Sequence, residues 1–94
     1  MKISALNLSE VKQWLRIDFD EDDNLLGQIM EAAKSQLVGM TGLTEAAVCD
    51  IPEMGYAYLC LCQQMYDVRD LTVSKDTINP NVMQIVRMHA VNYL

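Results

Sequence analysis

The chain has 94 residues, 51% of them hydrophobic and 21% charged, and its 13 acidic and 7 basic side chains give a net charge of −6. This length supports one domain, expected over residues 1–94, and the composition excludes a disordered or collagen-like chain. The few basic residues are scattered, which argues against binding to DNA, RNA or an anionic membrane, because clustered positive charge holds those ligands.

The chain also lacks the signals of a membrane or secreted protein. No stretch approaches the roughly 18 apolar residues that a membrane span needs, and the N-terminus has no signal-peptide pattern. The 3 cysteines are an odd set without a framework spacing. We therefore expect free thiols and a reducing cytosol.

The first predicted helix runs from about residue 8 to residue 16. Asn7 followed by Glu10 has the spacing of an N-cap with its reciprocal acid. Apolar residues, Trp14 among them, recur on one side of this helix. Ile17 and Phe19 then alternate with acidic residues, which predicts a brief extended link.

The second predicted helix is amphipathic and follows a run of acids. We expect Asp20 to be its N-cap, with Glu21, Asp22 and Asp23 in its first turn, where the helix dipole favours negative charge. Gly42 supplies a left-handed stop at its end.

The third predicted helix is apolar all round. Asp50 is its expected cap, with Pro52 in the first turn and Glu53 as the acid at the third position. Residues 54–66 carry apolar side chains in nearly every direction. Such a helix in a soluble protein is the central, enclosed one.

Residues 71–79 are rich in Thr, Val and Ile, which predicts an extended arm or short strand. Asn79 and Pro80 then cap and open a last helix. One of its faces carries Val82, Ile85, Val86, His89, Ala90 and Tyr93. The opposite face carries Met83, Met88, Val91 and Leu94. The predicted fold is therefore all-α, a compact bundle of about four helices with a short extended arm before the last helix.

The acidic run matches part of a calcium-binding pattern. Asp18, Asp20 and Asp22 have the alternate spacing of an EF-hand loop, but Asp23 stands where that loop needs Gly and Ile29 where it needs a bidentate Glu. These acids therefore fit better as helix-terminal carboxylates, which could also meet a basic neighbour.

The remaining reactive side chains predict no metal site, cofactor or enzyme. Cys60 and Cys62 would point about 200° apart on a helix, so they cannot share one metal ion. His89 lies in an apolar stripe, where packing or an interface contact is expected. No nucleophile with an orienting group and no phosphate-binding glycine loop accompanies it.

The last helix has two apolar faces, and a domain of this size cannot bury both of them. The apolar surface that remains favours a protein partner. Methionine usually fills core gaps, but on an outward face it also makes adaptable contacts. In contacts with a partner, we expect the last helix to bury apolar side chains and the acidic turn to form ion pairs. The candidate interface residues are Asp20, Glu21, Asp22, Asp23, Met83, Arg87, Met88 and Val91.

The segment 6–18, LNLSEVKQWLRID, resembles the opening of phage head–tail connector proteins. The similarity continues through the acidic turn with Leu25 and Leu26 and the helix that ends in Thr41-Gly42. A Pro-initiated apolar helix and the segment 79–82 extend it over nearly the whole chain. Related proteins are often labelled putative DNA-packaging proteins.

This resemblance implies a structural virion protein without catalytic residues. Such a subunit would assemble as a homo-oligomeric ring between the portal and the tail, with portal and tail-completion proteins as partners. It would act at the virion head–tail junction after assembly in the bacterial host cytoplasm. The alternative is a small cytosolic helical interaction or carrier module. An acyl carrier protein, however, needs an Asp-Ser-Leu site, and none of Ser4, Ser9, Ser35 and Ser74 stands in one.

Overall fold

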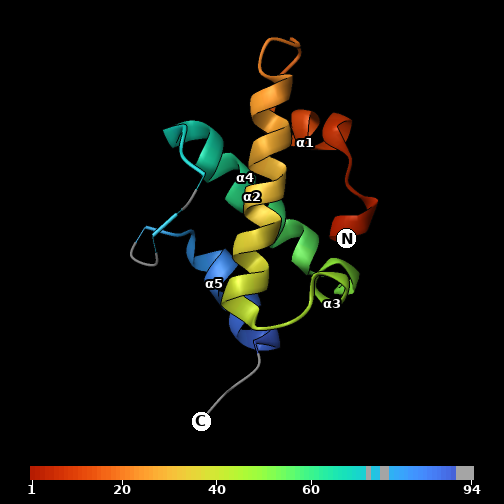
Figure 1. Ribbon diagram of the computed structural model, residues 1–94, viewed down its shortest axis with the longest axis vertical. Coiled ribbons are helices and arrows are strands. Elements are labelled where there is room, and N and C mark those ends of the chain that lie inside the picture. The colour runs from red at the N-terminus through yellow and green to blue at the C-terminus, as the bar shows by residue number, and fades with distance from the viewer. Residues whose placement is uncertain (72, 75–76, 91–94) are drawn as a thin grey trace.

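The computed structural model describes residues 1–71, 73–74 and 77–90, which form a helical bundle (Figure 1). Its elements are the 3-10 helix η1 (Ile3–Ala5) and the α-helices α1 (Leu8–Leu15), α2 (Asp23–Thr41), α3 (Glu45–Asp50), α4 (Met54–Val68) and α5 (Pro80–His89). No strand occurs in these described ranges, and the predicted all-α class is confirmed. Within them, no helix is both long and apolar enough to cross a membrane.

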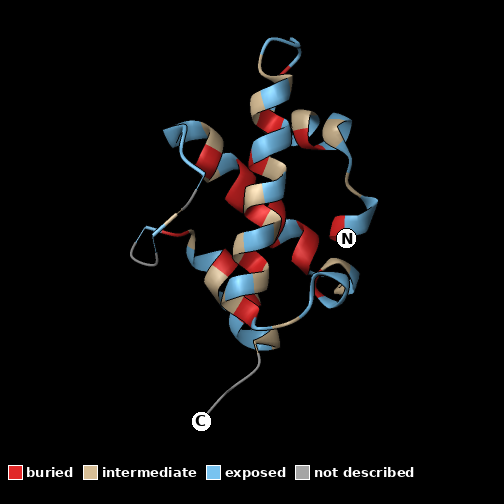
Figure 2. Ribbon diagram, in the orientation of Figure 1, coloured by how far each residue is buried: buried red, intermediate tan, exposed pale blue. Residues whose placement is uncertain are grey.

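Helix α4 occupies the centre of the bundle, as its all-round apolar sequence predicted. Helices α1, α2, α3, α5 and η1 all pack on it. Figure 2 shows buried positions along much of its length. The buried residues of α4 are Met54, Gly55, Ala57, Tyr58, Leu59, Cys60, Leu61, Cys62 and Met65.

Several predicted helix ends are confirmed by their capping geometry. The Asn7 side chain accepts a hydrogen bond from the Glu10 backbone N–H at 3.1 Å and starts α1. Helix α2 ends at Gly42, which adopts a left-handed conformation with φ 72°. The Asn79 side chain accepts from the Asn81 N–H, and Pro80 opens α5.

Two predicted caps are wrong. Helix α2 begins at Asp23 with Asp22 at the N-cap position, so Asp20 is not its cap. The carboxylates of Asp20 and Asp22 do not cap the helix, because both bind other side chains. Asp50 does not cap α4, because it is the last residue of α3 and pairs with Lys2 at 2.9 Å. Helix α3 itself was not predicted. Its Thr44 cap accepts from the Ala47 N–H, but six residues are too few to show a helical period.

Two glutamine side chains fasten the described part of the arm to the bundle. Gln36 donates to the Val73 carbonyl at 2.8 Å and accepts from the Val73 N–H at 3.2 Å. Gln64 donates to the Thr77 carbonyl and accepts from the Asn79 N–H, each at 2.7 Å. Side-chain amides thus take the place of strand pairing. The remainder of the predicted arm, residues 72 and 75–76, lies outside the described residues.

The N-terminal segment packs tightly against the start of α4. The Gly55 backbone N–H donates to the Met1 carbonyl at 2.9 Å, and the Met1 amino group donates to the Pro52 carbonyl. A Cβ atom at Gly55 would stand 2.1 Å from the Met1 carbonyl oxygen. This approach therefore requires glycine.

We predict that Gly55→Ala lowers the free energy of unfolding by about 1–3 kcal/mol, because backbone must move to admit the methyl group. Gly27→Ala and Gly39→Ala are matched helical controls, since a Cβ at either position meets nothing within 4 Å. Each should raise stability by about 0.5–1 kcal/mol. Urea unfolding of the three variants measures these effects, and equal changes at Gly55 and Gly27 would contradict the close approach.

Candidate interaction surfaces

The acidic turn, residues 16–22, joins α1 to α2 at one end of the longest molecular axis (Figure 1). Helix α1 ends at Leu15, and the C-cap residue Arg16 adopts a left-handed conformation with φ 60°. The chain then reverses direction through exposed residues 18–21, with Ile17 buried behind them.

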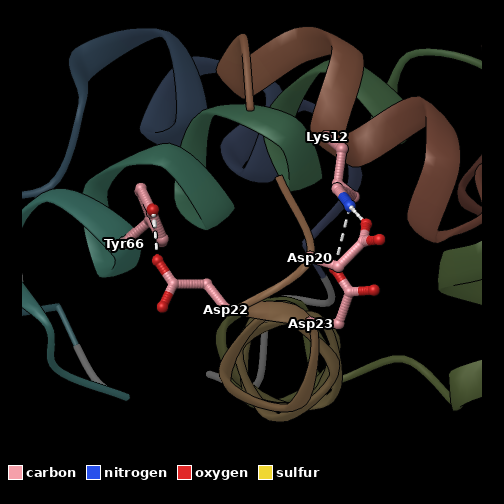
Figure 3. A network of polar contacts seen from close by, with 5 residues as sticks. All are labelled: Lys12, Asp20, Asp22, Asp23 and Tyr66. Atoms are coloured by element: carbon pink, nitrogen blue, oxygen red, sulfur yellow. Dashed lines mark hydrogen bonds and ion pairs between the residues drawn. The ribbon is translucent and has the colours of Figure 1, made fainter. Parts of the chain in front are cut away.

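Lys12 of α1 bridges two carboxylates of this region (Figure 3). Its Nζ lies 2.7 Å from Asp20 Oδ1 and 2.9 Å from Asp23 Oδ1, and its side chain is only 15% exposed. The hydrogen bond between Lys12 and Asp20 raises the pKa of Lys12 and lowers the pKa of Asp20. Lys12 therefore braces the acidic turn from inside.

Asp22 faces the opposite way, toward α4 (Figure 3). The Tyr66 hydroxyl donates to Asp22 Oδ2 at 2.6 Å, and the same oxygen lies 3.4 Å from an Arg69 guanidinium nitrogen. The hydrogen bond with Asp22 raises the pKa of Tyr66. Arg69 also stacks over the Tyr66 ring at 4.5 Å from its centroid. This group ties the start of α2 to the end of α4.

The predicted acidic interface residues thus have different surroundings. Asp20, Asp22 and Asp23 are engaged within the chain. Glu21 is exposed and forms no ion pair with another described residue. The neighbouring Phe19 is also 43% exposed. The sequence predicts only that Phe19 lies in an extended link. Its position between two acids is the one sequence feature that could have indicated an exposed aromatic residue.

The last helix presents its candidate interface residues unequally. Met88 is 65% exposed and Arg87 is exposed, whereas Met83 is half-buried against the core. Val91 lies outside the described residues. His89 is half-buried, and its Nε2 lies 3.1 Å from Glu53 Oε2, which links the end of α5 to the start of α4.

The cysteines have the surroundings of packing residues. Cys60 and Cys62 are buried and Cys49 is half-buried, all as free thiols. Burial raises the pKa of Cys62 to about 12, which disfavours its nucleophilic thiolate. Among the described residues, no three His, Cys, Asp or Glu side chains come together as a group that could hold a metal ion.

A surface aromatic pair was missed by the sequence analysis. Trp14 of α1 was expected on the apolar side of its helix, but it is 37% exposed. Its ring packs edge-on against Tyr56 of α4, with centroids 5.8 Å apart and planes at 90°. The α1 side of this pair borders a shallow hollow lined by Met1, Leu6, Glu10, Gln13, Trp14 and Leu59. Tyr56 belongs to the apolar stretch 54–66 that predicts an enclosed helix, so the sequence gives no signal for this surface pair.

Comparison with protein-family models matches residues 5–93 to the family described as phage gp6-like head-tail connector protein. The chain belongs to this family. Searches of curated proteins and of solved structures gave no match. The head-tail connector family has a structural role at the phage head–tail junction, which implies contacts with other virion components. The predicted resemblance to head–tail connectors is therefore confirmed, and it covers almost the whole chain.

The Lys12 brace of this connector predicts a two-sided pH dependence. The lowered pKa of Asp20 gives stability that is present above its ordinary value of 3.8 and lost as the pH falls through the lowered value. The raised pKa of Lys12 gives stability that is present below 10.5 and lost as the pH rises through the raised value.

Lys12→Met should therefore lower the urea midpoint most between about pH 5 and pH 10 and converge with wild type at both extremes. Lys34→Met is the control for loss of one positive charge, since Lys34 lies 3.7 Å from both Glu31 and Glu45 in a looser arrangement. It should lower the midpoint less. A pH-independent deficit in Lys12→Met would contradict the ion-pair origin of the brace.

Proposed function

We propose that this connector assembles as a ring of identical subunits between the portal and the tail of a tailed phage or prophage. The observation that carries the proposal is the family match over residues 5–93. Portal and tail-completion proteins would contact the two faces of the ring, with assembly in the bacterial host cytoplasm. Family membership favours this role over a small cytosolic interaction or carrier module.

The surface of the chain supports assembly. Both candidate regions expose an apolar side chain beside charge: Phe19 in the acidic turn, and Met88 next to Arg87 on α5. Neighbouring subunits related by rotation would cover each region once, so closure of a ring leaves neither exposed. We therefore assign inter-subunit contacts to the acidic turn and the outer side of α5.

Sedimentation velocity and electron micrographs of the purified chain, alone and with portal protein, test this function. We expect closed rings of the chain alone or rings formed on the portal. An unrelated acidic helical protein of similar size is the control for non-specific binding to the portal. A chain that stays monomeric at high concentration and does not bind the portal would overturn the proposal.

A further inference from the structure

Two exposed surfaces of this chain carry opposite charge. We define the acidic tip as Asp18, Phe19 and Glu21, in which the 43% exposed phenylalanine stands between exposed carboxylates. We define the α5 patch as Arg87 and Met88, in which the 65% exposed methionine lies beside an exposed guanidinium. Aromatic rings and the methionine thioether make favourable contacts, and Arg pairs well with carboxylates.

The two surfaces cannot meet within one molecule. Helix α2 runs from the acidic turn to the opposite end, where α5 terminates (Figure 1). The longest dimension of the molecule is 45 Å. Within the described residues, Asp18, Glu21 and Arg87 take part in no ion pair, unlike Asp20 and its neighbours. An ion pair between the two surfaces would therefore join two molecules.

The acidic tip is also held in place before any contact forms. Lys12 binds Asp20 and Asp23 on one side, and Tyr66 binds Asp22 on the other (Figure 3). These links fix the backbone on both sides of Glu21 and directly after Phe19. Preorganisation of this kind lowers the entropy cost of binding.

We propose that the acidic tip of one copy docks on the α5 patch of the next copy. Phe19 packs against Met88 of that copy, while Glu21 and Asp18 pair with its Arg87. In this head-to-tail contact each copy uses its acidic tip toward one neighbour and its α5 patch toward the other, and repetition generates a ring when the rotation closes. This contact rests on the proposed ring and specifies which surfaces build it.

A charge swap tests the contact in whichever setting the wild-type chain assembles, alone or on the portal. Glu21→Arg and Arg87→Glu should each weaken association at least about tenfold, and the double variant should recover to within about threefold of wild type. Asp67→Arg is the matched control, since Asp67 is exposed on α4 outside both surfaces, and it should assemble normally. Sedimentation velocity gives the association constants, and circular dichroism confirms that each variant is folded.

Mixing two defective variants tests the head-to-tail geometry. Phe19→Ser damages the acidic tip but keeps the α5 patch, whereas Arg87→Glu damages the patch but keeps the tip. An equimolar mixture should form two-chain complexes that grow no further, while each variant alone stays unassembled. Val68→Ser is the matched apolar control, because Val68 is 66% exposed near the end of α4 and belongs to neither surface.

The outcomes separate this contact from the proposed function. Single variants that assemble like wild type, or folded variants that the charge swap does not rescue, would overturn the contact and leave the ring intact. A mixture that forms no two-chain complex would overturn the head-to-tail geometry. A wild-type chain that neither self-associates nor binds the portal would overturn the ring itself and this contact with it.

Discussion

The burial of most of α4 is the constraint on which the rest of the structure depends. A helix with apolar side chains in nearly all directions is stable in water only when other elements cover most of its circumference. Helices α1, α2, α3 and α5 together with η1 supply that cover. Even the backbone takes part, because Met1 approaches Gly55 too closely for any side chain there. Many of the apolar side chains are therefore buried in the core of one small domain.

Covering α4 leaves the ends of the bundle to be held by polar contacts. Lys12 gathers Asp20 and Asp23, and Tyr66 holds Asp22 from the far end of α4. Buried or half-buried charges are stable only when they are paired, so these contacts restrict the path of the acidic turn. The negative charge that remains free in the turn is consequently concentrated next to Phe19. The acidic run looks uniform in sequence, but Asp20, Asp22 and Asp23 stabilise the fold, whereas Asp18 and Glu21 remain exposed.

The sequence predicted those features that depend on local or periodic patterns. The structure confirms the Asn7 and Asn79 caps, the end of α2 at Gly42 and the central position of α4. Each of these features depends on a few neighbouring residues or on the helical period. The partners of Asp22 and Asp50 are 44 and 48 residues away, so no local rule could identify them. Side-chain partners also occupy Asp20 and Asp22, so neither of these acids caps the start of α2.

The arrangement of the free surfaces also bears on symmetry. A two-fold axis that passes through either surface would set acid against acid at the turn or guanidinium against guanidinium at α5. Like charges brought together in this way oppose association, whereas unlike ends attract. A chain with Glu21 near one end and Arg87 near the other therefore has a direction. The electrostatics of this connector therefore favour contacts in which the acidic turn of one molecule meets the exposed end of α5 of another.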